Sequence, residues 1–321
     1  MPQRAVLLLA HGTPQTIDEI PAYLRNVTSG RPLPPQVVEE IRHRYSLIGH
    51  SPLTEITLEQ ARLVEAELAA AGLPARVYVG MRNWRPYIPD VVKGMRADGV
   101  EEAAVICLAP QNSRTSVGLY RRAAEAEAGS IRIDFTAGWA RHPQLIEAFA
   151  ERLLPAWTRL QQETGAPVPV LFTAHSVPSR TVEPAADGQP ADPYAEEARA
   201  TADLVAACLP PGAERRFAFQ SQGQSGGAGS SVIWLGPTVE ETLDSLAASG
   251  HKVVLLQPIG FLCDHVEILY DVDIAFRQYA ARLGLRLERP ESLNASLPLA
   301  RAVADLARQG WARLADLSGP V

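Results

Sequence analysis

The stretch from Val253 to Phe276 combines a strand with the side chains best suited to chemistry. It opens as a short apolar run and closes as a predicted helix, so its acidic and imidazole groups fall at a strand-to-helix junction. Glu267 and Asp271 are spaced to share one face of that helix. Two such carboxylates repel each other unless a cation or a proton lies between them. A solvated helix face is the competing explanation.

The start of this helix carries two further polar residues. Asp264 and Glu267 fit the spacing of a helix capping box, so we expect Asp264 to cap the helix. His265 lies close to Glu267 in the sequence, but we expect its side chain to point in another direction. We therefore interpret His265 as a supporting or structural residue rather than a reacting one.

A second candidate, His175, follows the apolar run 168–174. The run 168–174 and the run that opens at Val253 could both be central strands of one parallel sheet. His175 and Glu267 would then lie at the same edge of that sheet, where such sheets bind ligands. A neutral imidazole facing a carboxylate can accept a proton or form part of a metal site. A turn histidine bonded only to backbone is the alternative. The nucleophile-elbow pattern is absent around His175 and Ser176, and dinucleotide-binding and P-loop patterns are absent from the chain, which argues against those chemistries.

The order of predicted elements indicates an internal repeat. Residues 10–14 read AHGTP after one apolar strand, and residues 174–178 read AHSVP after another. In each half a helix, a glycine, a second strand and a proline follow in the same order. We therefore predict an α/β protein made of two similar halves, 1–150 and 151–321, each with a parallel sheet flanked by helices. Residues 26–53 form an excursion bounded by proline and glycine, suited to covering a cleft.

Composition narrows the class of protein. The chain has 321 residues, is 46% hydrophobic and carries a net charge of −6 with a pI near 5.7, which argues against nucleic-acid binding. No apolar run reaches membrane-spanning length, and the N-terminal run is too short for a signal peptide. Three cysteines without a paired spacing argue against a disulfide framework or a four-cysteine cluster. We expect a cytoplasmic protein.

Five sequence blocks resemble a known family. Residues 172–178 (FTAHSVP), 234–246 (WLGPTVEETLDSL) and 260–274 (GFLCDHVEILYDVDI) are similar to signature blocks of ferrochelatases. Residues 44–53 (RYSLIGHSPL) and 80–88 (GMRNWRPYI) add matching blocks in the first half, in the family's order. The resemblance implies two Rossmann-like domains around a porphyrin cleft and insertion of ferrous iron into a free-base porphyrin during haem synthesis.

The resemblance also implies roles for individual residues. His175 matches the family's invariant site histidine and Glu267 its facing glutamate, so both are expected to be catalytic. These two, with Asp271 at the next acidic position, are the expected metal-binding residues, and His265 is the possible supporting residue. The expected porphyrin-binding residues are His11, Arg44, Tyr45, Ser51 and Tyr120.

This chain departs from the family pattern at several positions. Ala275 replaces a further acidic residue, so the acidic line along the helix is shorter. His11 stands where relatives have a tyrosine or an apolar residue. In members that act on coproporphyrin, the residue at this position can ligate the product iron. Thr28 replaces an expected arginine, which leaves Arg31 as a substitute. Three cysteines argue against the iron–sulfur cluster of some relatives, so no cofactor beyond the substrate Fe²⁺ is expected.

The porphyrin that the enzyme uses is the finer question. The excursion 26–53 is polar, so no membrane-docking surface is apparent, and we expect a monomer that converts coproporphyrin III to coprohaem III. Protoporphyrin IX, giving protohaem, is the first alternative. A cobalt or nickel chelatase of the same fold and a non-enzymatic haem or porphyrin carrier are the others, since histidine and glutamate do not select iron by affinity.

Overall fold

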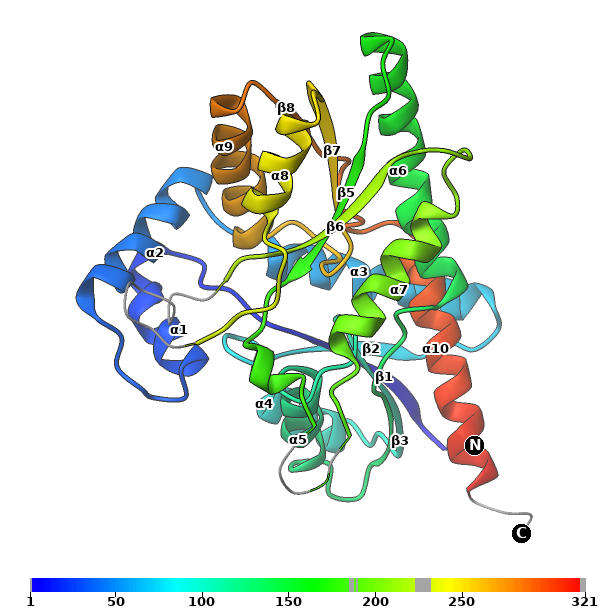
Figure 1. The fold of residues 1–321 in the computed structure, drawn as a ribbon. Coiled ribbons are helices and arrows are strands. Elements are labelled where there is room, and N and C mark those ends of the chain that lie inside the picture. Colours follow the sequence, from blue (N-terminus) through cyan, green and yellow to red (C-terminus); the bar gives the residue numbers. More distant parts are fainter. Residues whose placement is uncertain (1, 185–187, 189, 223–231, 318–321) are drawn as a thin grey trace. The chain divides into compact units, whose positions relative to one another are not determined.

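The structure, a computed structural model, describes residues 2–184, 188, 190–222 and 232–317. The chain forms two compact units (Figure 1). The first contains Met1–Gln144 and Asn294–Val321, and the second contains Leu145–Leu293. The expected contiguous division at residue 150 therefore differs from these units in the placement of the C-terminal segment.

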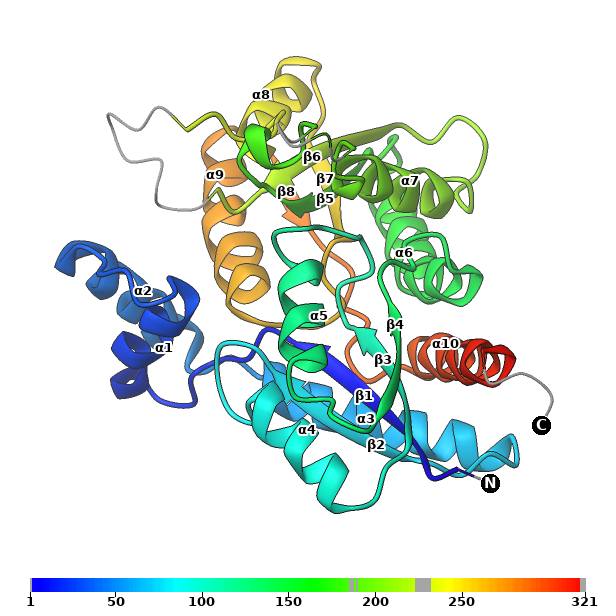
Figure 2. The ribbon, with the colours of Figure 1, turned by 90° about the horizontal axis from the view of Figure 1, so that it is seen from below.

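The first unit is built on a four-stranded parallel sheet with the order β2-β1-β3-β4. Helices cover both of its faces, which is why its strands are almost continuously apolar: in β1, residues 5–10 are all buried. Helices α4 and α5 pack on one face, and α3 and α10 contact each other on the opposite one (Figure 2). The elements are β1 (Arg4–Ala10), α3 (Leu53–Ala70), β2 (Arg76–Met81), α4 (Ile88–Ala97), β3 (Glu102–Cys107), α5 (Val117–Glu125), β4 (Arg132–Thr136) and α10 (Leu297–Asp316).

The excursion lies between β1 and α3 and is helical. Residues 26–53 include the end of α1 (Ile20–Val27), which follows the short 3₁₀ turn η1 (Ile17–Glu19), and all of α2 (Pro35–Ile48). The two helices pack against each other. A proline at the first position of α2 fixes the backbone angle that a helix start requires. Helix α2 therefore occupies the middle of residues 26–53.

The second unit repeats the same plan with the strand order β6-β5-β7-β8, again all parallel. Helix α8 and the helical segment after β7 cover one face, and α6 and α7 lie on the other (Figures 1 and 2). The elements are α6 (Pro143–Thr164), β5 (Val170–His175), η2 (Ser179–Thr181), α7 (Tyr194–Ala206), β6 (Arg215–Gln220), α8 (Val239–Ala248), β7 (Val253–Pro258), η4 (Glu267–Phe276), α9 (Arg277–Arg282) and β8 (Arg286–Glu288).

The internal repeat is confirmed at the level of hydrogen bonds. The two sheets have the same strand order, so β1 corresponds to β5 and β3 to β7. After the edge strand of each sheet the chain folds back in the same way. The Met81 N–H donates to the Pro86 carbonyl at 2.6 Å, and the Phe219 N–H donates to the Pro237 carbonyl at 2.8 Å.

Two expectations about local structure are corrected. The segment after β7 is a π-helix, in which hydrogen bonds close wider turns than in an α-helix. Asp264 does not cap it: the residue before η4 is Val266, and no side chain caps that end. The Asp264 carboxylate instead accepts a hydrogen bond from the Ser292 hydroxyl at 2.7 Å. Asp264 is used in tertiary contacts that sequence spacing does not reveal.

Helix α10 lies close to the first sheet at Gly310. A Cβ added there would lie 3.2 Å from the Ala104 Cβ and 2.8 Å from an Asp134 oxygen, which Arg313 holds in place. We expect Gly310→Ala to lower the free energy of unfolding by about 1–3 kcal/mol, because the helix must move away from the sheet. Urea denaturation measures this change.

Gly94 in α4 is the matched control, since nothing lies within 4 Å of an added Cβ there. Gly94→Ala should raise the free energy of unfolding by about 0.4–1 kcal/mol, because alanine restricts the unfolded chain and favours the helix. Equal effects of the two substitutions would contradict this description of the α10 contact.

Candidate active site at the carboxyl end of the second sheet

His175 is the last residue of β5, an inner strand of the second sheet. The chain that leaves the neighbouring strand β7 crosses over the carboxyl end of β5. The Ile259 and Gly260 N–H groups both donate to the Thr173 carbonyl, at 2.8 and 3.3 Å. A Cβ on Gly260 would lie 3.0 Å from the Ala174 Cα, so only glycine permits this approach. The approach brings the segment that follows Gly260 next to His175.

The His175 side chain is held as a neutral base. Its Nδ1 contacts the Ser176 carbonyl, which can only accept, so Nδ1 carries the proton and Nε2 keeps its lone pair. Burial lowers the pKa of His175 below its ordinary value of 6.5, and this outweighs the opposing charge of Glu267. The Tyr194 hydroxyl fixes the backbone by donating to the His175 carbonyl at 2.8 Å. Near neutral pH, His175 can therefore accept a proton.

His265 has the opposite protonation preference. Its Nε2 lies 2.7 Å from a Glu267 carboxylate oxygen, and its Nδ1 lies 2.9 Å from the Cys263 carbonyl. Burial lowers the pKa of His265, but the charge and hydrogen bond of Glu267 outweigh it, so the pKa is raised overall. Two accepting partners favour an imidazolium that donates from both nitrogens. The expectation that His265 points away from Glu267 is wrong.

The Phe261 ring contacts both imidazoles. Its ring meets the His175 ring edge-on, with centroids 6.2 Å apart, and lies 4.5 Å from the centroid of His265. One aromatic side chain thus contacts both a base and a protonated group that is paired with a carboxylate. Neighbouring titratable groups whose pKa values are moved apart by their environment are typical of acid–base sites.

Asp271 is buried and has a different partner. The Ser221 hydroxyl donates to its carboxylate, and the Ser221 hydroxyl itself accepts a bond from the Gln220 amide at 3.3 Å. The Gln220 carbonyl oxygen accepts from the Thr173 hydroxyl at 2.6 Å. This polar chain links β5, β6 and η4. The carboxylates of Glu267 and Asp271 therefore have different side-chain partners, His265 and Ser221.

The structure also bears on metal binding. Among residues 2–184, 188, 190–222 and 232–317, no group of three or more His, Cys, Asp or Glu side chains is arranged to hold a metal ion. His175, Glu267 and Asp271 thus do not form a preassembled three-ligand cage. Their expected role as metal ligands stays a prediction.

The expected porphyrin-binding residues lie in the first unit, and two of them flank the carboxyl end of β1. The exposed His11 ring contacts the Tyr23 hydroxyl at 3.1 Å and the Asn83 amide at 3.1 Å. The hydroxyl of the buried Tyr45 lies 3.0 Å from that of Thr13. Both expected residues therefore gather at the strand end that corresponds to the end of β5.

Of the other three expected residues, two lie on helices and Ser51 lies in the connection between α2 and α3. Arg44 pairs with Glu40 along α2. The hydroxyl of Ser51 is buried without a hydrogen-bond partner among the described residues, which is an unfavourable state for a polar atom. Tyr120 on α5 packs below the Arg82 guanidinium, which lies 5.7 Å from its ring centroid. Their expected role stays a prediction.

Sequence reasoning missed Phe261, Tyr194 and Ser221. Phe261 lies inside the block 260–274 and close to His265 in the sequence, which is the signal that could have found it. Tyr194 and Ser221 act through the fold alone, since each contacts a residue far away in the sequence.

Comparison with known proteins gives the family directly. The sequence profile described as Ferrochelatase matches residues 3–310. This chain belongs to the ferrochelatase family. A protein of Acidobacterium capsulatum named Ferrochelatase is 57% identical over 98% of this chain and 97% of its own length. A protein of Geobacillus kaustophilus named Coproporphyrin III ferrochelatase is 31% identical over 97% of both chains.

Solved structures agree on the fold. The sirohydrochlorin chelatase SirB of Bacillus subtilis subspecies spizizenii, in complex with cobalt, matches with a TM-score of 0.54 and 13% identity. This match covers 96% of this chain and 95% of SirB. The siroheme-biosynthesis enzyme CbiX matches with a TM-score of 0.50 and 14% identity, over 95% and 99% of the two chains. At such identities these matches show the chelatase-like fold alone.

Family membership confirms the assignment to haem biosynthesis. The expectation of two similar α/β units of the chelatase type is confirmed as well. Within the described parts of the chain, every helix is too short or too polar to cross a membrane.

The pairing of His265 with Glu267 can be tested by titration. Glu267→Gln should lower the pKa of His265, because burial remains while the charge that raises the pKa is removed. In the wild-type protein the raised pKa means that the pair stabilises the fold below pH 6.5, and that this stabilisation is lost as the pH rises through the folded pKa. Heteronuclear NMR of the histidine rings measures both.

His251, which lies 3.0 Å from Glu214 and outside the altered pair, serves as the internal control for an unchanged fold. A His265 ring that titrates unchanged in Glu267→Gln would contradict the pairing.

Proposed function

We propose that this chain inserts ferrous iron into coproporphyrin III and releases coprohaem III. The observation that carries the chemistry is the pair of imidazoles around Phe261, one neutral and one favoured as the cation. Membership of the ferrochelatase family supplies the reaction class. The choice of coproporphyrin III as the substrate is a proposal that family membership does not supply.

The proposed reaction balances without an oxidant or reductant. A free-base porphyrin and Fe²⁺ give the iron porphyrin and two protons. His175 accepts a pyrrole proton at Nε2, since its Nδ1 proton is directed at the Ser176 carbonyl. The porphyrin supplies four nitrogen ligands to the metal, so the protein does not need a complete cage of its own.

Glu267 and Asp271 have electrostatic roles in this proposal. The Glu267 carboxylate, held by His265, attracts the approaching cation and receives protons that leave the ring. Asp271, held by Ser221, extends the acidic line along η4. Carboxylate oxygen and imidazole nitrogen both suit Fe²⁺. His265 acts as the partner that orients Glu267.

The excursion supports a water-soluble substrate. Among residues 26–53, all of which the structure describes, Leu47 is the only large hydrophobic side chain classed as exposed, at 51%. Coproporphyrin III carries four carboxylates, whereas protoporphyrin IX carries two and is delivered at membranes. Relatives that are 31–34% identical are named coproporphyrin III ferrochelatases. We propose His11, Arg44, Tyr45, Ser51 and Tyr120 as porphyrin contacts, with Arg82 beside Tyr120 as a further cation for the carboxylates.

No cofactor beyond the substrate iron is proposed. Cys107 and Cys263 are buried free thiols, and burial raises the pKa of each to about 12. Cys208 is exposed. Because the thiolate is the metal-binding form, two of the three cysteines are poor cluster ligands. We also propose that the protein works in the cytoplasm as a monomer.

Replacing the proposed base should abolish turnover. We expect His175→Ala to lower kcat by about 10²–10⁴-fold while the porphyrin still binds, because general-base catalysis contributes on that scale. Steady-state absorbance kinetics and porphyrin fluorescence titration measure the two quantities. His251→Ala, in the same unit but paired with Glu214, is the matched control. Near-normal turnover of His175→Ala would remove His175 from the mechanism.

The substrate choice has its own test. We expect kcat/KM for coproporphyrin III to exceed that for protoporphyrin IX, because the protein offers cations to the additional carboxylates and little exposed apolar surface in the excursion. Both porphyrins are assayed in the same detergent concentration. A clear preference for protoporphyrin IX, together with binding to lipid vesicles, would establish the first alternative.

The same assay separates the remaining alternatives. Faster insertion of Co²⁺ or Ni²⁺ than of Fe²⁺ would indicate a chelatase for another metal. Tight porphyrin or haem binding without insertion of any metal would indicate a carrier.

A further inference from the structure

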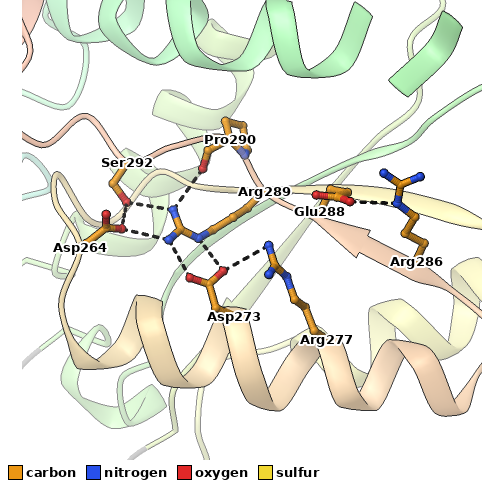
Figure 3. A network of polar contacts seen from close by, with 8 residues as sticks. All are labelled: Asp264, Asp273, Arg277, Arg286, Glu288, Arg289, Pro290 and Ser292. Carbon is orange, nitrogen blue, oxygen red and sulfur yellow. Dashed lines mark hydrogen bonds and ion pairs between the residues drawn. The ribbon is translucent and has the colours of Figure 1, made fainter. Parts of the chain in front are cut away.

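Arg289, the residue directly after β8, lies at the centre of a polar network (Figure 3). Its guanidinium donates to both carboxylate oxygens of Asp273, at 2.8 and 2.7 Å, and lies 3.1 Å from an Asp264 oxygen. It also donates to the Pro290 carbonyl at 3.2 Å and the Ser292 hydroxyl at 3.4 Å. The Arg289 side chain is only 11% exposed, so Arg289 is a nearly buried cation whose guanidinium is surrounded by these hydrogen-bond and ion-pair partners.

The two carboxylate partners of Arg289 lie on either side of Glu267 and Asp271 in the sequence. Asp264 precedes η4, and Asp273 lies within it, so Glu267 and Asp271 fall between the two anchors in the sequence. Ser292 reinforces the first anchor through its 2.7 Å bond to Asp264. A single side chain therefore ties the loop before η4 and the helix itself to the chain after β8.

This anchoring matters because η4 is a π-helix. Its wide turns are uncommon, and π-helical turns frequently occur at functional sites. A planar, bidentate arginine fixes direction as well as distance, in contrast to a point charge. Rotation of η4 about its axis would move the Glu267 and Asp271 carboxylates together. Catalytic groups tolerate little displacement, since a misplacement of about 1 Å costs up to about 10²-fold in rate.

We propose that Arg289 is a positioning residue that sets the rotation of η4 and so holds Glu267 and Asp271 in place for catalysis. The kinetic part of this proposal rests on the proposed iron insertion. The structural part does not, because it concerns the order of η4 alone.

The chain offers a matched control in Arg286, on the adjacent strand β8. Arg286 also has two carboxylate partners, Glu163 at 2.5 Å and Glu288 at 2.9 Å, but its side chain is 44% exposed. Neither partner belongs to η4: Glu163 lies in α6 and Glu288 in β8 itself (Figure 3 shows the latter pair). Arg286→Gln therefore removes a comparable set of ion pairs without releasing the π-helix.

The first measurement is kinetic. We expect Arg289→Gln to lower kcat by about 10- to 100-fold with the porphyrin Kd unchanged within twofold, because positioning acts on the reaction and not on porphyrin binding. Arg289→Lys should recover only part of the rate, since lysine keeps the charge but not the bidentate geometry. Arg286→Gln should keep the wild-type kcat.

The second measurement does not depend on iron insertion. Amide hydrogen exchange over residues 267–276 should become faster in Arg289→Gln, whereas exchange over α8 (Val239–Ala248) should not change. If the wild-type protein inserts no iron but η4 loses protection in this variant, the proposed function fails and the anchoring stands.

The proposal is overturned if folded Arg289→Gln keeps wild-type kcat and wild-type protection of η4. It is also overturned if Arg286→Gln lowers kcat as much, since a general loss of stability then explains both. Should Arg289→Gln fail to fold, Asp273→Asn replaces it, because this change weakens the bonds between Arg289 and the helix, together with the 3.5 Å pair of Asp273 with Arg277. Unchanged kcat and unchanged exchange in Asp273→Asn would equally overturn the proposal.

Discussion

The ion pair between His265 and Glu267 is the interaction on which the site depends. Burial alone would keep both imidazoles neutral. By pairing at 2.7 Å, His265 and Glu267 keep a carboxylate charged next to an apolar ring, while burial keeps His175 neutral. The result is a base, an acid and a negative charge around Phe261.

The internal repeat explains where these groups are found. Corresponding strands, β1 and β5, each carry a histidine at the carboxyl end: His11 directly follows β1 and His175 is the last residue of β5. The two ends have diverged in their surroundings. His11 is exposed beside Tyr23 and Asn83, whereas His175 lies under Phe261 and the chain that leaves β7. The same backbone plan therefore provides one solvent-accessible imidazole and one with a depressed pKa.

The helical segments that follow the third strand of each sheet have also diverged. In the first unit α5 is an ordinary α-helix packed into the core through Val117 and Tyr120. In the second unit the corresponding place is taken by the π-helix η4, which contributes Ile268 and Val272 to the core and Glu267 and Asp271 to polar networks. A wide-turn helix that serves both purposes needs support from outside, and Arg289 provides it from the chain after β8.

The sequence by itself determined the two parallel α/β units, most helices and strands, and the strand ends that carry His175 and Glu267. These features follow from local apolar periodicity and from the position of residues at strand ends. Both depend only on residues that are close together in the sequence. Only the tertiary structure decided that Asp264 serves Arg289 instead of capping a helix, that His265 turns to Glu267, and that Ser221 holds Asp271. The tertiary structure also placed α10 on the first sheet. Direction and protonation depend on which distant groups are packed nearby, and that information is not contained in local spacing.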